Sequence, residues 1–297
     1  MNALTERAAA AYLGLALGDT LGATVEFMTP REIRAQYGVH DRIRGGGWLN
    51  LRPGQVTDDT TMALALGEAI LTHGQVRAQP VAEAFDAWMR AKPVDIGNTV
   101  RRGLLHFRKT GATEVPLSEH DAGNGAAMRV LPVALATLGQ PETAVRLACQ
   151  VQAHVTHHNP LSDAATEALA LMVHAALSGA DKLRLLHEHA HPLAARHPEF
   201  TFRGVRQQTN PSGYVADTLV AVFQALFDTD DFESCLIDVV NRGGDADTTG
   251  AIAGMLAGAL YGPEALPARW LDALDPMVRA ACANQARRLL RLRPAST

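Results

Sequence analysis

The stretch GGDADTTGAIAGMLAGALYG, residues 243–262, joins an acidic beginning to an apolar, glycine-rich continuation. Glycine recurs there at every fourth position, which draws a smooth stripe along one side of a helix. Because glycine inside a helix costs about 1 kcal/mol relative to alanine, close packing of helix backbones must offset that cost. The same spacing occurs near the N-terminus, so the two sets are Gly14, Gly18 and Gly22, and Gly250, Gly254, Gly258 and Gly262.

A helical pattern also extends through the rest of the chain. In residues 161–179, LSDAATEALALMVHAALSG, a cap at Ser162 or Asp163 precedes a single apolar stripe. Clear alternating strand patterns and low-complexity linkers are missing from the sequence. We therefore expect a compact, all-α multi-helix bundle that forms one domain over residues 1–297. The helices that begin near Thr60 and Thr248 are expected to be its rigid central supports.

Composition narrows the class of protein. Hydrophobic residues make up 47% and charged residues 20% of the chain, as in a soluble globular protein with a substantial core. The net charge of −4 argues against a nucleic-acid partner. Cys149, Cys235 and Cys282 lie far apart without a CxxC pair, which predicts buried free thiols in a reducing compartment.

The N-terminus does not have the pattern of a secretory signal. Glu6 and Arg7 precede a short apolar stretch, where a signal peptide would have a basic start and a cleavage site. No stretch reaches the roughly 20 apolar residues of a membrane helix. These features predict a cytoplasmic protein without direct membrane insertion.

Aspartate and threonine gather at two places, each just before an apolar run. The first is VTDDTTMALAL, residues 56–66, and the second begins at Asp245. Helix capping explains one or two such residues at each place, but here there are more. A buried carboxylate without a partner is costly, so it is usually paired or binds a metal. The nearest basic residue to the second cluster is Arg242, three positions before Asp245.

Oxygen ligands without sulfur or a regular histidine pair suit Mg²⁺ or Mn²⁺. The four aspartates of the two clusters have the capacity to hold two divalent ions. Helix capping combined with a buried polar network is the alternative interpretation. The aspartates are Asp58, Asp59, Asp245 and Asp247.

Six segments of the chain, in order, resemble the ADP-ribosylglycohydrolase family. Together they extend over nearly the whole chain, and six motifs in order are far more specific than any one of them. They are LGLALGDTLGATVEF (13–27), GGGWLNLRPGQVTDDTTMALALG (45–67), KPVDIGNTVRRG (92–103), DAGNGAAMRVLP (121–132), VTHHNPLSDA (155–164) and NRGGDADTTGAIAGMLAGALYG (241–262).

The resemblance implies a single-domain, all-α fold with two Mg²⁺ or Mn²⁺ ions in a cleft. It also implies hydrolysis of the bond between ADP-ribose and a protein acceptor. One branch of the family removes ADP-ribose from an arginine of dinitrogenase reductase and so reactivates that enzyme, and we expect this activity here. The metal ligands implied are Thr57, Asp58, Asp59, Asp245, Asp247 and Thr248.

Three acids are candidates for catalysis: Asp95, Glu26 and Asp59. A carboxylate within hydrogen-bond reach of the attacking water or of the leaving group can take or give the proton. Asp95 lies two residues after Pro93 and two before Gly97, so it is expected on a loop; alternatively it caps a helix that begins near Asn98. Glu26 resembles a mobile glutamate of the family; alternatively it is an exposed acid at a helix end.

The segment DAGNGAAMR is typical of a phosphate or ribose cradle, because its glycines let backbone approach a ligand and a helix follows them. A plain turn is the alternative. Arg129 either neutralises phosphate or forms a structural ion pair, and His158 has no assigned role. With the resemblance, the candidates for binding ADP-ribose are Asn98, Gly123, Asn124, Gly125, Met128, His157 and Tyr214, the last of which could instead be a buried tyrosine at a helix start.

A second histidine-rich segment carries His187, His189 and His191. These side chains could bind a metal, but an exposed helix end and loop is the interpretation that we favour.

Two other functions fit the residues. One is an ADP-ribose reader without catalysis, although such a reader need not keep the full set of acids. The other is a metal-dependent hydrolase that releases phosphate from a nucleotide. The resemblance further implies a PII signalling protein as partner and, through it, an ammonium channel that holds the enzyme reversibly at the membrane.

Overall fold

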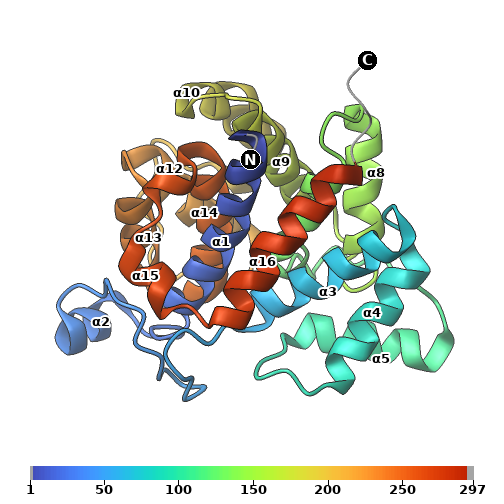
Figure 1. Ribbon diagram of the computed structural model, residues 1–297, viewed down its shortest axis with the longest axis horizontal. Helices are drawn as coiled ribbons and strands as arrows, with labels where there is room; N and C mark the ends of the chain where they lie inside the picture. Colours follow the sequence, from blue (N-terminus) through green and yellow to red (C-terminus); the bar gives the residue numbers. More distant parts are fainter. Residues whose placement is uncertain (1–2, 293–297) are drawn as a thin grey trace.

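Two glycine-lined helices, α1 (Ala3–Gly22) and α14 (Ala246–Tyr261), pack along each other at the centre of the molecule (Figure 1). A side-chain carbon placed on Gly14 would collide with the carbonyl of Gly254, and one placed on Gly18 would collide with that of Gly250. The two glycine stripes predicted from the sequence therefore face each other. This close approach holds the polar ends of both helices in fixed register.

The computed structural model describes residues 3–292, and among these it contains helices and two isolated β-bridges but no strand. The predicted all-α class is thereby confirmed. The outermost residues of the predicted domain, 1–2 and 293–297, lie outside the described residues.

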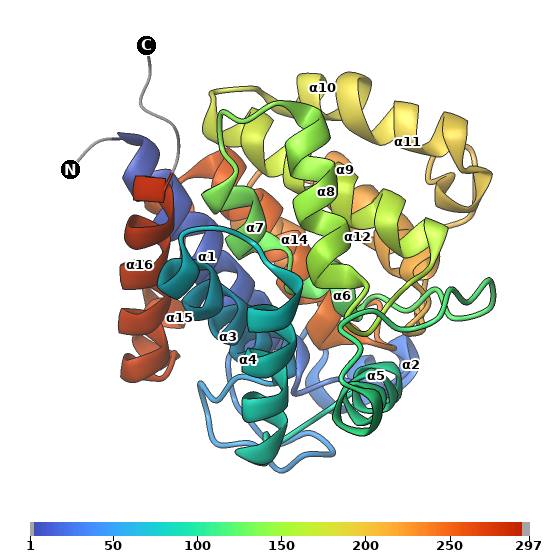
Figure 2. The same cartoon turned by 90° about the vertical axis from the view of Figure 1, so that its right-hand side faces the viewer.

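Helices on several sides cover the central pair, and Figure 2 shows α10 and α11 along one edge of the molecule and α5 near the opposite edge. Helices that pack directly on α1 or α14 are α3 (Asp58–His73), α6 (Gly125–Met128), α7 (Leu131–Ala136), α9 (Pro160–Leu177), α12 (Val215–Asp228), α13 (Phe232–Val240) and α16 (Pro276–Leu289).

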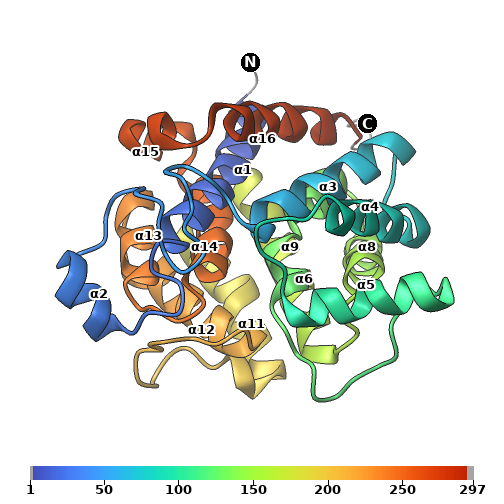
Figure 3. The same cartoon turned by 90° about the horizontal axis from the view of Figure 1, so that it is seen from below.

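The outer helices are α2 (Pro30–Tyr37), α4 (Ala78–Arg90), α5 (Asn98–Thr110), α8 (Glu142–Ala153), α10 (Lys182–Leu185), α11 (His191–Arg196) and α15 (Ala268–Ala273). Short 3₁₀ or π turns complete the chain at Leu186–Ala190, Pro198–Phe200, Pro263–Ala265 and Leu290–Leu292. In Figure 3, α2 and α5 lie on opposite sides of the view, with α6 and α14 between them.

Candidate metal centre and substrate cavity

The N-terminal ends of α3 and α14 bring the two acidic clusters together. The hydroxyl of Thr57 lies 3.4 Å from Oδ2 of Asp59 and 3.5 Å from Oδ2 of Asp247, and the hydroxyl of Thr248 lies 3.3 Å from Oδ2 of Asp59. The N-cap residues of these helices, Thr57 and Asp245, make no side-chain cap hydrogen bond. Ordinary capping therefore does not account for the clusters.

Asp59 is the most buried of the four aspartates in the two clusters. It is buried, and its Oδ1 has no hydrogen-bond partner. Burial, followed by the charges of Asp58, Asp19 and Asp245, raises its pKa well above the ordinary value. A buried carboxylate oxygen without a hydrogen-bond partner is expected to contact a cation.

The neighbouring carboxylates share this environment. Burial raises the pKa of Asp58 to about 7, with further contributions from the charges of Asp95 and Asp19. Burial, then Glu26 and Asp59, raises the pKa of Asp247 well above its usual range. Within residues 3–292, the ion pairs of lysine and arginine involve other acids, so no basic side chain is in ion-pair contact with Asp58, Asp59 or Asp247. The donor set fits hard divalent cations.

Asp19 is a buried acid that the sequence analysis missed. It lies on α1, and its carboxylate accepts hydrogen bonds from the backbone N–H of Thr57 at 3.0 Å and of Thr60 at 3.1 Å. Burial raises its pKa to about 6, against hydrogen bonds from both threonines that lower it. Asp19 thus fixes the start of α3. The signal in the sequence was an aspartate directly after Gly18, among mostly apolar neighbours in this helix.

A cavity of about 630 Å³ opens beside the acidic cluster. The structure brings to its wall most of the predicted site residues, which are Glu26, Asp58, Asp95, Asn98, Gly123, Asn124, Gly125, Met128, His157, Asp245, Asp247 and Thr248. Thr57, Asp59 and Tyr214 are not part of this lining. Thr57 and Asp59 lie behind it, in contact with lining residues.

Glu26, Asp95 and Asp247 each offer a carboxylate oxygen, and these oxygens lie within 4.8 Å of one another. Two of the three predicted catalytic acids, Glu26 and Asp95, therefore lie beside a predicted metal ligand. Glu26 is only 5% exposed, so its interpretation as an exposed helix-end acid is wrong. Burial, with the charges of Asp245, Asp95 and Asp58, raises its pKa to about 8, although a hydrogen bond from Trp48 lowers it.

Asp95 lies on the loop before α5, as predicted. Its Oδ1 accepts a 2.7 Å hydrogen bond from the N–H of Ile96, and burial raises its pKa. Gly97 is the N-cap of α5 and this helix has no side-chain cap, so the capping interpretation of Asp95 is wrong. The N–H of Gly97 instead points toward Oδ2 of Asp58 at 3.4 Å.

Two aromatic residues at the rim were also missed. Phe27 is 64% exposed and Trp48 is 51% exposed, and their ring centroids are 5.4 Å apart. Both line the cavity. Trp48 reaches this position from the run Gly45–Gly46–Gly47, in which every glycine has positive φ. Glycine adopts such angles without strain, so the three consecutive glycines were the signal in the sequence for this turn.

The predicted cradle surrounds His157. A side-chain carbon on Gly123 or Gly125 would lie 2.9 Å or 2.8 Å from the His157 ring, so both glycines make room for it. Burial, with the charges of Arg129 and Arg102, lowers the pKa of His157 well below its usual value, which keeps the ring neutral.

Asn124 connects this cradle to the acidic cluster. Its Nδ2 donates to Oδ2 of Asp245 at 2.7 Å and to the hydroxyl of Thr218 at 2.9 Å. The predicted helix after the glycines, α6, is a single turn, so it contributes little dipole to anion binding.

Arg129 is fully buried and is structural. Its guanidinium donates to the side chain and carbonyl of Gln152 and to the hydroxyl of Thr156, and it lies 4.5 Å from the centroid of the Phe85 ring. A phosphate role is therefore wrong. Tyr214 is 38% exposed at the N-cap of α12, so its alternative as a buried tyrosine is also wrong.

The model of the ADP-ribosylglycohydrolase family matches residues 1–296. The chain belongs to this family. It is 50% identical to ADP-ribosyl-[dinitrogen reductase] glycohydrolase of Rhodospirillum rubrum, over 97% of this chain and 96% of that protein. It is 33% identical to an ADP-ribosylarginine hydrolase of Serratia proteamaculans, over 97% of this chain and 80% of that one. A solved ADP-ribosylglycohydrolase-related protein complex superposes with a TM-score of 0.86 at 35% identity, over 98% of this chain and 99% of that chain.

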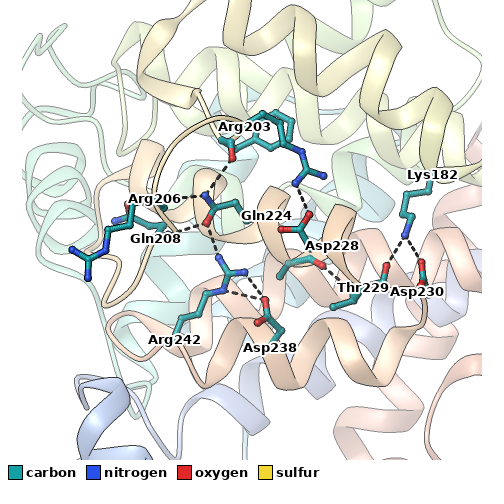
Figure 4. Close-up of polar contacts among 12 residues, drawn as sticks. Lys182, Arg203, Arg206, Gln208, Gln224, Asp228, Thr229, Asp230, Asp238 and Arg242 are labelled. Carbon is teal, nitrogen blue, oxygen red and sulfur yellow. Dashed lines mark hydrogen bonds and ion pairs between the residues drawn. The ribbon is translucent and has the colours of Figure 1, made fainter.

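In this member of the ADP-ribosylglycohydrolase family, Arg242 does not pair with Asp245. Its guanidinium pairs with Asp238 and donates to Oε1 of Gln224 at 2.8 Å (Figure 4). Gln224 also accepts from the N–H of Gln208 and donates to the carbonyls of Phe202 and Arg206. This buried network holds the segment before residues 210–213, which line the cavity.

Other expectations concern the surface and the thiols. The three cysteines are buried and free, as predicted. His187 and His191 are exposed, and the segment is helical throughout rather than part loop. Among residues 3–292 no helix is long and apolar enough to cross a membrane.

Proposed function

We propose that this chain hydrolyses the N-glycosidic bond between ADP-ribose and an arginine side chain of a target protein, and that the target is dinitrogenase reductase. The observation that carries the activity is the convergence of two acid–threonine clusters with Glu26 and Asp95 at one cavity wall. The 50% identity to the Rhodospirillum rubrum glycohydrolase supports the choice of target.

Thr57, Asp58, Asp59, Asp245, Asp247 and Thr248 are the residues that would hold two divalent ions, Mg²⁺ or Mn²⁺. When bound, such ions supply charge stabilisation at the ribose oxygens and acidify water. Oδ1 of Asp59, which has no hydrogen-bond partner, and the raised pKa values of Asp58, Asp59 and Asp247 support this donor set. Asp59 lies behind the cavity wall, so its role is that of a ligand rather than of a proton carrier.

We assign proton transfer to Glu26 and Asp95, the two acids of the cavity wall that are not among the proposed metal ligands. The reaction breaks the bond between ribose C1″ and the guanidinium nitrogen, and water adds its oxygen to C1″. Asp95 takes a proton from that water, and Glu26, whose raised pKa keeps it protonated, gives a proton to the leaving nitrogen. Bound cations would offset the part of the Glu26 shift that comes from neighbouring acids.

ADP-ribose is proposed to lie along the other wall of the cavity. Neutral His157, whose ring lies against Gly123 and Gly125, is the residue that we expect to contact the ribose or the diphosphate. Asn98, Asn124 and Met128 complete this wall. Tyr214 does not line the cavity, but a backbone bridge joins it to Gly123, and we propose that it contacts the ligand from the adjoining surface.

The test is a product analysis with ADP-ribosylarginine as substrate and either Mg²⁺ or Mn²⁺. Release of intact ADP-ribose and free arginine is expected. Release of phosphate with the glycosidic bond intact would favour a nucleotide hydrolase, and binding without turnover at saturating metal would favour an ADP-ribose reader.

We further propose that the protein acts in the cytoplasm and is held at the membrane through a PII signalling protein and an ammonium channel. Similarity to the nitrogenase-regulating branch supports this regulation. The test is sedimentation with membranes in the presence and absence of the PII protein, and PII-independent sedimentation would contradict it.

A further inference from the structure

A second group of potential metal ligands lies outside the acidic centre. The end of α8, the start of α9 and the segment after α5 bring together His154, His158 and Glu114. One ligand atom from each lies within 4.8 Å of the others. The side chain of Glu114 is 59% exposed, so the group is reachable from solvent.

The two separations that involve Glu114 match those between ligands of a tetrahedral ion. Oε1 of Glu114 lies 3.3 Å from Nδ1 of His154 and 3.2 Å from Nδ1 of His158. A hydrogen bond between a protonated imidazole and a carboxylate is usually shorter, at about 2.7–2.9 Å. Two ligands on a tetrahedral ion with bonds of about 2.0–2.1 Å are about 3.3 Å apart.

The ring nitrogen of His154 that faces away from Glu114 has the carboxylate partner that is usual for a metal-bound histidine. Its Nε2 lies 3.0 Å from both oxygens of Asp163. A carboxylate at this position fixes the proton on Nε2, leaving the Nδ1 lone pair for a metal. Burial lowers the pKa of His154, but the hydrogen bond and charge of Asp163 and the charge of Glu114 outweigh it and raise the pKa. Metal binding would therefore displace a proton from His154.

We propose that His154, His158 and Glu114 form a binding site for one transition-metal ion of the Zn²⁺ or Co²⁺ type, oriented by Asp163. Imidazole ligands suit such ions, whereas the acidic centre offers oxygen only. The two sites are therefore chemically separable. This inference does not depend on the proposed hydrolase activity.

Binding requires a local rearrangement. The two imidazole rings stack with centroids 3.9 Å apart and planes at 25°, so each ring must turn for its lone pair to reach a common ion. Nδ1 of His158 also lies 2.9 Å from the carbonyl of Val115, and the ion takes the place of the proton shared there.

The ion would fasten one segment to the helix junction. The N–H of Val115 donates to the carbonyl of His154, and the N–H of Ser118 donates to the carbonyl of His158. A shared ion adds a side-chain link to this backbone pairing. His157, the residue before His158, lines the substrate cavity, so the proposed ion would lie next to that wall.

The experiment titrates the full chain with Co²⁺ in the presence of saturating Mg²⁺, followed by visible absorption and bound-metal analysis. The wild-type protein is expected to bind one more Co²⁺ per chain, with imidazole-type bands, than the double variant His154→Gln/His158→Gln. Glu114→Gln, at an exposed position, is expected to weaken this binding at least about tenfold. The variant His187→Gln/His191→Gln removes another histidine pair and should match the wild type.

A second readout is thermal unfolding with Zn²⁺. Zn²⁺ is expected to raise the melting temperature of the wild type and of the control, but not that of the His154/His158 variant. Equal Co²⁺ stoichiometry and spectra in the wild type, in Glu114→Gln and in the double variant would overturn the proposal. In that case the cluster is an ion pair only.

Discussion

The indole Nε1 of Trp48 donates a 2.6 Å hydrogen bond to Oε2 of Glu26 at the rim of the cavity. The glycine run before Trp48 makes this reach possible, and the bond fixes the carboxyl group that we propose as the proton donor. The bond thereby links the glycine turn that precedes the first acidic cluster to the proposed proton donor.

Removing this hydrogen bond while keeping an aromatic ring should slow turnover. Trp48→Phe is expected to lower kcat by up to about tenfold, because a hydrogen bond to a neutral carboxyl group contributes about 0.5–1.5 kcal/mol. The KM for the ADP-ribosylated substrate should change much less. Steady-state kinetics give both values, and Phe27→Leu, which changes the ring packed on Trp48 but keeps the indole Nε1 donor, is the matched control.

Asp245→Ala should abolish turnover and metal binding while leaving the helix content intact. The carboxylate of Asp245 lines the cavity, and its protein partner is the amide of Asn124 rather than a cation. Metal titration, activity and circular dichroism test this. Asp272→Ala, at an exposed carboxylate, is the control. Activity at the wild-type level in Asp245→Ala would refute the two-cluster centre.

Asp95→Asn separates binding from chemistry. The amide keeps the size of the side chain but cannot take a proton from water, so turnover should fall at least about a hundredfold. ADP-ribose binding with metal present should persist, since Asp95 is not part of the cradle around His157. Calorimetric titration and turnover measurements check this, and loss of both together would contradict the assigned role.

The pH dependence of stability follows from the acids of the centre. Burial holds the pKa of Asp58 at about 7 and that of Asp19 at about 6, above the ordinary value of 3.8. The folded protein therefore binds more protons than the unfolded chain between about pH 4 and 7, and metal-free protein should lose stability as pH rises through this range.

Two additions test the origin of this loss. Asp58→Asn removes one of the titrating groups, so its melting temperature should fall less steeply over the same range. Saturating Mn²⁺ should restore stability at the upper end, because the ion binds the ionised carboxylates of the folded state. The lowered pKa of buried His157 acts in the opposite direction over this range, so the comparison with Asp58→Asn is the decisive one. A melting temperature that falls equally steeply in the wild type and in Asp58→Asn would contradict the account.

The helix pair that carries the centre should tolerate no side chain at its contact. Gly18→Ala is expected to lower the free energy of unfolding by more than about 3 kcal/mol, because the added carbon meets the carbonyl of Gly250. Gly97→Ala has open space and ordinary φ, so its unfolding in denaturant should differ little from wild type.

The sequence predicted those features that depend on residue spacing. The four-residue period of glycine predicted central helices, and the paired Asp–Thr motifs predicted an acidic centre at helix N-termini. Glycine spacing alone could not show that the two stripes pack on each other, since this contact joins the two ends of the chain.

The sequence did not predict features that depend on distances between residues in the folded structure. Asp19 has no neighbouring acid in sequence, and only the packing of α1 against α3 brings it under Thr57. Trp48 and Glu26 are separated by a loop whose turns are set by consecutive glycines with positive φ. Arg242 was close in sequence to Asp245, but the helical turn directs it to Asp238 instead.

The most direct test uses the metal-stripped protein and dinitrogenase reductase that carries ADP-ribose on arginine. The mass of the reductase is followed after addition of Mn²⁺ or Mg²⁺. The account predicts metal-dependent loss of one ADP-ribose from the reductase with wild-type protein and none with Asp245→Ala. A modification that stays in place at saturating metal, or that Asp245→Ala removes equally well, would contradict it.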